Sequence, residues 1–205
     1  MHQSLMAGSP NRVLSNPACK AGCLRESLIH RSKMEASLMA GDVFPFVIQQ
    51  QEQDNWCWVA TTVSVAAFYE PGSLWEQCFW VDDALGTTNC CTAGSTPACN
   101  QPWPVSSGLI RVGHLDRIES GTATELEPEI AARRPVVTAI LWSGGGGHAP
   151  LINGYGDVVV SLNPFVLERY LYVQDPFYGS SFVSYNSFRM AYQGLGRWVR
   201  TYYTK

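Results

Sequence analysis

The stretch QQQEQDNWCWVATTVSVAAFY, residues 49–69, joins a polar segment to a run of small and apolar residues. The run contains neither glycine nor proline until Pro71-Gly72, so the sequence predicts a buried helix that stops there. Asp54 and Asn55 lie just before the run and are candidate helix caps. Cys57 lies at the predicted helix start. It is either an ordinary core residue or a thiolate at a helix N-terminus.

The composition is that of a globular domain with no basic surface. The chain has 205 residues, of which 46% are hydrophobic and 15% charged, which favours one domain with a proper core. A net charge of -3 gives no electrostatic footprint for nucleic acid. No window approaches the roughly 20 apolar residues that span a bilayer. We therefore expect no nucleic-acid partner and no membrane span; the sequence does not indicate an oligomeric state.

Residues 1–43 have no convincing periodicity and differ from the rest of the chain. They carry scattered basic residues among Ser, Ala and Gly, and they lack the apolar core of about 7–15 residues that a secretory signal needs. We interpret them as a poorly ordered leader or pro-segment and residues 44–205 as the folded domain. An early start codon, or an export address for a specialised secretion system, remains an alternative.

Four of the seven cysteines lie close together, namely Cys78, Cys90, Cys91 and Cys99. A bond between the adjacent Cys90 and Cys91 is sterically poor, so the pairings 78–90 with 91–99, or 78–91 with 90–99, are favoured. Free thiols are an alternative. A zinc site is disfavoured because the stretch has no Cys-x2-Cys pairs and no histidine, and we expect no metal or other cofactor. Disulfides would indicate a secreted or otherwise exported protein.

The remaining pattern changes from helical to extended. We predict helices over 73–85 and 122–135, with a long loop over 86–108. Strand candidates follow at VVTAILW, HAPLINGYG, ERYLYVQDP, SFVSYNSF and GRWVRTYYT, with turns at 154–157, 175–176 and Gly194. A helical first half and a strand-rich second half predict an α+β fold, with helices packed on an antiparallel sheet.

A nucleophilic cysteine needs a base, and the base needs a group that orients it. His148 follows four glycines at the mouth of a predicted strand, where an imidazole can face a cleft. The other three histidines lie in the leader or in a polar stretch. Asp175 ends a later strand and can accept the Nδ1 proton of the imidazole. Cys57, His148 and Asp175 are therefore the candidate catalytic residues.

An oxyanion formed at Cys57 would need hydrogen-bond donors. The backbone N–H of Cys57 is one candidate, because the first N–H groups of a helix lack partners. A side-chain amide from the preceding loop would add a second donor. Gln51 lies six residues before Cys57 and is the preferred candidate; Gln49, Gln50 and Gln53 compete with it.

Together these features resemble the papain-like cysteine peptidases. The motifs NWCWVATTVSVAAFY, QC, CC, CNQP, RPVV, GGGGHAPLINGY and VQDP are similar to the short bacterial branch, which includes effector peptidases of plant-pathogenic bacteria and, more distantly, bacteriocin-leader peptidases. The resemblance runs from about residue 49 to residue 203. It implies a papain-like fold with a cleft between its halves, and it makes Cys57 the nucleophile, His148 the base, Asp175 the orienting group and Gln51 the oxyanion glutamine.

The sequence also departs from the plant papains. Only Cys57-Trp58 remains of their C-G-[SA]-C-[WY] signature, and an aspartate replaces the usual asparagine. The resemblance implies a cysteine peptidase that acts on a protein or peptide substrate through a covalent thioester. The alternatives are another thiol acyl-transfer enzyme, such as a peptidoglycan amidase, a transglutaminase or a deamidase, and an inactive papain-like binding module.

Overall fold

The structure, a computed structural model, describes residues 38–72, 74 and 76–205. Most of the expected leader, with Cys19 and Cys23, falls on residues 1–37, outside the described residues. The folded unit runs from Leu38 to Lys205, so it begins ahead of the expected boundary at residue 44. The segment before that boundary, β1 (Leu38–Val43), pairs antiparallel with a central strand. Among the described residues, no helix is long and apolar enough to cross a membrane.

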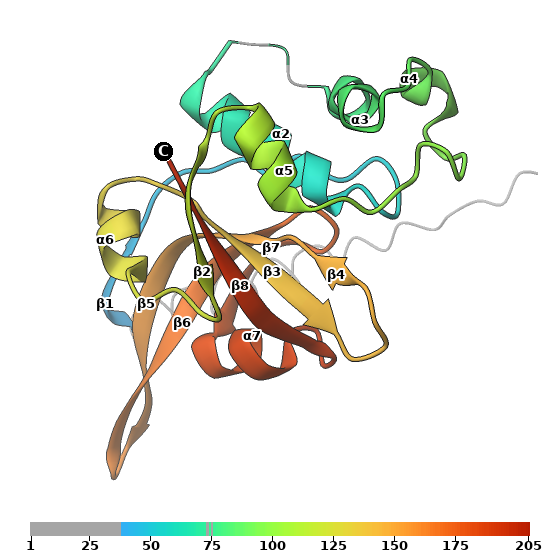
Figure 1. The fold of residues 1–205 in the computed structure, drawn as a ribbon. Coiled ribbons are helices and arrows are strands. Elements are labelled where there is room, and N and C mark those ends of the chain that lie inside the picture. The colour runs from blue at the N-terminus through green and yellow to red at the C-terminus, as the bar shows by residue number, and fades with distance from the viewer. Residues whose placement is uncertain (1–37, 73, 75) are drawn as a thin grey trace, which may run out of the picture. The chain divides into compact units, whose positions relative to one another are not determined.

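A layer of four helices forms the first half of the described chain (Figure 1). Its elements are α2 (Cys57–Tyr69), α3 (Gln77–Leu85), α4 (Cys90–Ala93) and α5 (Val105–Arg111). The helix predicted from residue 56 is confirmed, and every residue from Trp58 to Ala66 is buried because small and β-branched side chains let neighbours approach on all sides. At the crossing with α5, Gly108 lies against Thr62 so closely that a Cβ would clash.

The second half of the chain builds an antiparallel sheet. Its strands are β2 (Leu115–Ser120), β3 (Val136–Trp142), β4 (Gly147–His148), β5 (Leu151–Leu162), β6 (Phe165–Asp175), β7 (Gly179–Ser184) and β8 (Gly196–Thr204). The strand order is β2-β8-β3-β5-β6-β7, with β1 on β5 and β4 on β3. Two short helices, α6 (Leu126–Ala131) and α7 (Tyr185–Ala191), complete the unit. This arrangement confirms the α+β prediction.

The core has two parts because successive residues of a strand face opposite sides of the sheet. Val137 of β3 packs with α2, α5 and the disulfide-bonded segment on one side. Its neighbour Val136 packs with α6, α7 and the aromatic residues of β8 on the other. Figure 1 shows the same division, with α2 and α5 on one side of the sheet and α7 on the opposite side.

Several element predictions were wrong in part. The helix predicted over 73–85 is a helix only from Gln77, and α4 and the start of α5 lie in the segment predicted as a loop. The helix predicted over 122–135 is confined to α6. The turn expected at 154–157 does not exist: β5 runs through it, because Gly154 is needed for the close approach of β1, where a Cβ would meet the side chain of Val43.

The segment SFVSYNSF is only half a strand. Extended structure ends at Ser184, whose hydroxyl accepts a hydrogen bond from the backbone N–H of Ser187 at 3.2 Å. This N-cap starts α7, so the second half of the predicted strand is helical. The strands predicted at 136–142 and 196–204 are confirmed, as are the turns at 175–176 and Gly194.

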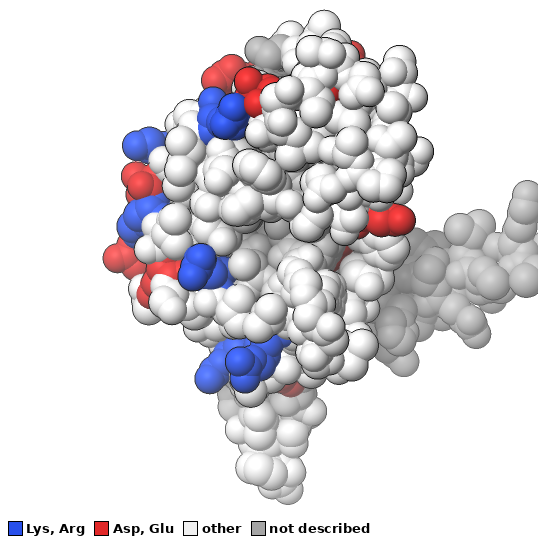
Figure 2. Space-filling model, turned by 45° about the vertical axis from the view of Figure 1, so that its right-hand side comes forward, with Lys and Arg blue, Asp and Glu red and all other residues white. Residues whose placement is uncertain are grey.

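Figure 2 shows a face on which acidic and basic side chains lie near one another along one side, while most of the remaining surface is uncharged. Ion pairs account for several of the charges in the described residues. Arg169 pairs with Asp157 at 2.5 Å and with Glu127 at 2.7 Å, and Arg111 pairs with Asp83 at 2.5 Å. The face in this view therefore presents no extended patch of one sign.

Candidate active site

Cys57 is the first residue of α2 and is partly exposed. Among the described residues it is the only cysteine that is not in a disulfide. The predicted caps are wrong: the N-cap position is Trp56, and no side chain caps the helix. Asn55 instead makes two hydrogen bonds of 2.9 Å with Asn100, one from its backbone N–H and one from its amide. The first N–H groups of α2 are thus left without a side-chain cap beside the thiol.

The two tryptophans that flank Cys57 hold the opposite wall of the site. The indole N–H of Trp56 donates to the carbonyl of Cys99 at 2.9 Å, and that of Trp58 donates to the carbonyl of Gln101 at 3.2 Å. The next residues of this segment, 102–104, line the cleft above the thiol. Trp56, for which the sequence predicts no specific role, therefore joins the nucleophile-bearing helix to the cleft wall.

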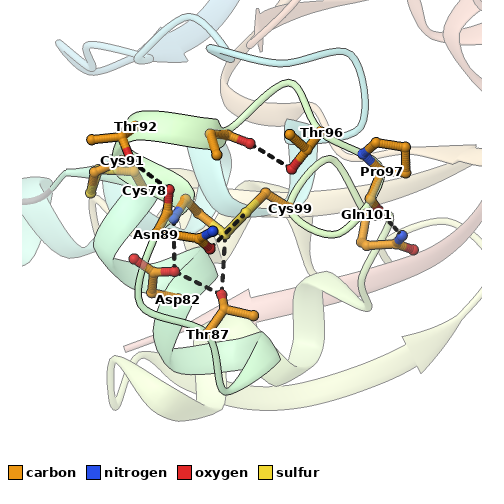
Figure 3. The surroundings of a disulfide bond; sticks show 12 residues. Cys78, Asp82, Thr87, Asn89, Cys91, Thr92, Thr96, Pro97, Cys99 and Gln101 are labelled. Atoms are coloured by element: carbon orange, nitrogen blue, oxygen red, sulfur yellow. Dashed lines mark hydrogen bonds between the residues drawn. A yellow bond between two sulfur atoms is a disulfide. The ribbon is translucent and has the colours of Figure 1, made fainter.

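This wall segment is cross-linked by disulfides (Figure 3). The bonds are Cys78–Cys91 and Cys90–Cys99, the second of the two expected pairings. Asp82 organises the neighbourhood, because its Oδ1 accepts hydrogen bonds from the Cys90 N–H at 3.0 Å and from the Thr87 hydroxyl at 2.7 Å. Disulfides in this position indicate an oxidising environment for the folded protein.

His148 lies on β4, which pairs with β3. Its Nε2 lies 2.8 Å from Oδ2 and 2.9 Å from Oδ1 of Asp175, and the ring lines the same cleft as Cys57. The expected contact between Nδ1 and Asp175 is therefore wrong. The carboxylate reaches the distal nitrogen because β6 brings it to that end of the ring, so Nδ1 is not engaged by Asp175.

Asp175, the last residue of β6, is completely buried and is surrounded by donors. Its Oδ1 accepts the backbone N–H groups of Phe177 at 2.7 Å and Tyr178 at 2.8 Å, since Pro176 turns the chain back over the carboxylate. Its Oδ2 accepts the hydroxyl of Tyr192 at 2.7 Å. Tyr192 could not be found from the sequence, because no local pattern marks a tyrosine 17 residues away as a partner of Asp175.

The electrostatics of this pair follow from its hydrogen bonds. Burial lowers the pKa of His148, but the hydrogen bonds to Asp175 and to Cys57 outweigh it and raise that pKa from 6.5 to about 9. Burial would raise the pKa of Asp175, but the bonds from His148 and its other donors hold that pKa below its ordinary value. The site therefore favours an imidazolium beside an ionised carboxylate at neutral pH.

Aromatic rings enclose the imidazole. The ring of Trp142 stacks on His148, with centroids 5.7 Å apart at 25°, and the ring of Tyr178 meets it edge-on at 6.1 Å. These rings limit access of water to the His148–Asp175 pair, which strengthens its hydrogen bonds relative to bonds in bulk water.

Gln51 lies at the cleft, but its amide is engaged. Its backbone N–H donates to the carbonyl of Pro176 at 2.8 Å, which ties the loop before α2 to the turn after Asp175. Its Nε2 donates to the carbonyls of Gln53 at 2.9 Å and Asp54 at 2.8 Å, while its Oε1 is buried without a partner in the described residues. Of the four candidate glutamines, Gln51 alone lines the cleft in the described part of the chain.

The cleft has a volume of about 630 Å³ and a largely aromatic lining, with Asp54 as its one acidic residue in the described part of the chain. It contains Gln51 and Cys57 from the helical half and His148 from the sheet. Most of its other lining residues are aromatic, proline or glycine: Trp58, Pro102, Trp103, Pro104, Trp142, Gly145, Gly146, Gly147, Phe177, Tyr178 and Tyr202. A partly exposed thiol, a hydrogen-bonded imidazole and a buried carboxylate therefore meet at a groove that can hold an extended chain.

We expect the His148 imidazole to titrate near pH 9 and not near 6.5. Because its pKa is raised, the ring keeps its proton below that pH, and the stabilisation that the charged ring adds is lost as pH rises through about 9. Removing the thiol in Cys57→Ala should lower this pKa, because the hydrogen bond to Cys57 is one of its causes. NMR of the histidine ring in both proteins measures the effect; equal pKa values would show that Cys57 does not contact the imidazole.

Comparison with known protein families identifies the chain. A family model described as papain-like cysteine protease AvrRpt2 matches residues 40–193, most of the chain and all of the residues that form the thiol–imidazole–carboxylate site. No curated protein was found to match the sequence. The matched span, together with the helical and antiparallel layers described above, shows that the chain belongs to the AvrRpt2 family of papain-like cysteine proteases.

Proposed function

We propose that this cysteine peptidase hydrolyses peptide bonds with Cys57 as nucleophile, His148 as acid and base, and Asp175 as the group that orients His148. The observation that supports this assignment most directly is the hydrogen bond of His148 to the buried Asp175, in a cleft that His148 shares with Cys57 at the start of α2. The remaining lining of the cleft contains no second thiol in the described residues.

The proposed reaction has two halves. In the first, Sγ of Cys57 attacks the carbonyl carbon of the peptide bond, and the imidazolium of His148 gives its proton to the departing amine, which leaves a thioester on Cys57. In the second, neutral His148 takes a proton from water as the water oxygen attacks the thioester. The acid product departs, and the thiolate and imidazolium are restored. Asp175 stays ionised throughout and holds the ring through Nε2.

The oxyanion of each half-reaction needs donors. We propose that the uncapped N–H at Cys57 supplies one and the amide of Gln51 the other. In the structure, Nε2 of Gln51 gives both hydrogen bonds to backbone carbonyls, so this role requires the amide to turn and release one of them. The buried Oε1 without a partner lowers the cost of such a turn, since that orientation leaves a polar atom unsatisfied.

The test is mass spectrometry of a proteome treated with the protein, against the same protein alkylated beforehand with an E-64-type epoxide. The proposal predicts new peptide N-termini only with the unmodified protein, and the epoxide on the peptide that carries Cys57. Deamidated or cross-linked glutamines without new peptide N-termini would indicate another acyl-transfer reaction in place of peptide hydrolysis. Cleavage of cell-wall fragments alone would indicate an amidase, and no change of any kind would indicate a binding module.

We also propose that the protein is exported to an oxidising compartment or out of the cell, because its two disulfides close the segment that forms the cleft wall. Mapping of disulfides in protein isolated from its native source, with free thiols blocked before lysis, tests this. Blocked thiols at the four paired cysteines would overturn it.

A further inference from the structure

Tyr192 is the only member of the buried hydrogen-bond cluster at Asp175 that neither reacts nor lines the cleft in the described part of the structure. Its side chain is 2% exposed. Its hydroxyl donates to Oδ2 of Asp175 at 2.7 Å, the same oxygen that contacts Nε2 of His148 at 2.8 Å. The amide of Gln193 is hydrogen-bonded to the same hydroxyl. A chain of hydrogen bonds therefore runs from Cys57 through His148 and Asp175 to Tyr192.

The backbone fixes Tyr192 from both directions. Its N–H donates to the carbonyl of Gly196, and the N–H of Gly196 donates back to its carbonyl, each at 2.8 Å. The loop between them turns at Gln193 and Gly194, which have φ values of 50° and 81°. At Gly196 a Cβ would meet the ring of Trp142, so the loop is held against the residue that stacks on His148.

Packing fixes the ring as firmly as the loop. Phe188 of α7 meets it edge-on at 4.8 Å, and Trp142 lies nearly parallel to it at 6.4 Å. Trp142 thus covers the rings of both Tyr192 and His148. Because the ring of Tyr192 is fixed in one orientation, its hydroxyl already points at the Asp175 carboxylate, and the hydrogen-bond donor is pre-organised.

We infer that Tyr192 is a positioning residue of the peptidase, whose hydroxyl keeps Asp175 ionised and aimed at Nε2 of His148. The inference rests on the proposed function of Cys57, His148 and Asp175. A carboxylate held by several donors cannot rotate away from the imidazole, and each donor stabilises its charge. The titratable groups that face the Asp175 carboxylate are His148 from β4 and, beyond it, Cys57 from α2. Tyr178 faces it from the turn after β6, and Tyr192 faces it from the loop after α7.

The variant Tyr192→Phe removes one hydroxyl and keeps the ring. Because a hydrogen bond to a charged group is lost, we expect kcat to fall about ten-fold. KM should stay unchanged, since Tyr192 does not contact the cleft. The pH at which the Asp175 carboxyl takes up a proton should rise by about one unit, because the lost donor favoured the charged form. Tyr185→Phe is the matched control, since Tyr185 begins α7, the helix that ends just before Tyr192, and its hydroxyl makes no hydrogen bond among the described residues.

Making Tyr192→Phe in a second protein, Asp175→Asn, distinguishes a positioning role of Tyr192 from a general effect on stability. In Asp175→Asn the acceptor is neutral, and a bond to a neutral group is worth roughly half of one to a charged group, so the same substitution should lower kcat only about three-fold there. The measurements are steady-state kinetics of the wild type, the two single variants, the double variant and the Tyr185→Phe control on one peptide, and NMR titration of the aspartate carboxyls.

An equal fall of kcat in both backgrounds, or an unmoved Asp175 titration, overturns the role of Tyr192. Inactive wild-type protein overturns instead the proposed function. The titration still reports on Tyr192 in that case, because it does not depend on activity.

Discussion

Replacing Cys57 by alanine is expected to abolish peptide cleavage, with kcat/KM falling about 10⁵-fold to 10⁶-fold. The side chain is partly exposed and forms no disulfide, so alanine leaves the fold and the His148–Asp175 pair in place. What disappears is the atom that would form the thioester in the proposed mechanism. Cleavage of a reporter peptide, followed at high enzyme concentration for many hours, measures the loss.

The variant Cys57→Ser is the matched control for packing. It restores the size of the side chain but supplies a hydroxyl, which is a far weaker nucleophile without a strong base. Both variants should keep the wild-type melting temperature and lose labelling by the epoxide. If Cys57→Ala retained more than a thousandth of wild-type activity, the nucleophile would have to be sought elsewhere.

Replacing Asp175 by alanine is expected to lower kcat/KM by about 10²-fold to 10⁴-fold. His148 would lose the partner of its Nε2, so its pKa would fall and its ring would lose its orientation. The same change leaves three donors without an acceptor in a buried site: the N–H groups of Phe177 and Tyr178 and the hydroxyl of Tyr192. We therefore also expect a loss of stability of about 3–5 kcal/mol.

The variant Asp175→Asn separates the two effects. The amide oxygen can still accept hydrogen bonds, as the asparagine at the matching position of the plant papains would, so the loss of kcat/KM should stay well below that of alanine. Urea denaturation gives the free energy of unfolding of each variant, and activity is compared only where the protein is folded. Equal activity losses in Asp175→Asn and Asp175→Ala would show that the negative charge, and not the orientation, is what His148 needs.

The candidate site residues could be predicted where a reactive side chain lies at the start or the end of a helix or strand that the sequence itself indicates. Cys57 at a helix start, His148 after four glycines and Asp175 at a strand end each combine a local element with a reactive group, and the structure brings these three together. The disulfide pairing could be narrowed to two schemes by the adjacency of Cys90 and Cys91, but only the fold of α3 and α4 selects one.

The parts that were missed depend on long-range contacts. Asn55 has the composition of a helix cap, yet its amide is used by Asn100, which is 45 residues away. The orientation of His148 follows from the direction in which β6 delivers Asp175, which no sequence pattern encodes. The same holds for Tyr192 and Gln51. The residues next to them in the sequence do not indicate that Tyr192 binds the Asp175 carboxylate or that Gln51 binds backbone carbonyls.

The proposed nucleophile comes from the helical half of the folded unit and its proposed base from the sheet, and this has a consequence for the chain during its synthesis. The helical layer ends at Gly113, an exposed glycine with φ 77°, and the sheet residues that carry the imidazole and the carboxylate follow it. The ribosome therefore synthesises Cys57 well before His148 and Asp175. A partly made chain therefore contains the proposed nucleophile without its proposed base and orienting carboxylate. The sheet that holds both of these residues is complete only when β8 has been made, because β8 lies between β2 and β3, so the proposed site is assembled at the very end of synthesis.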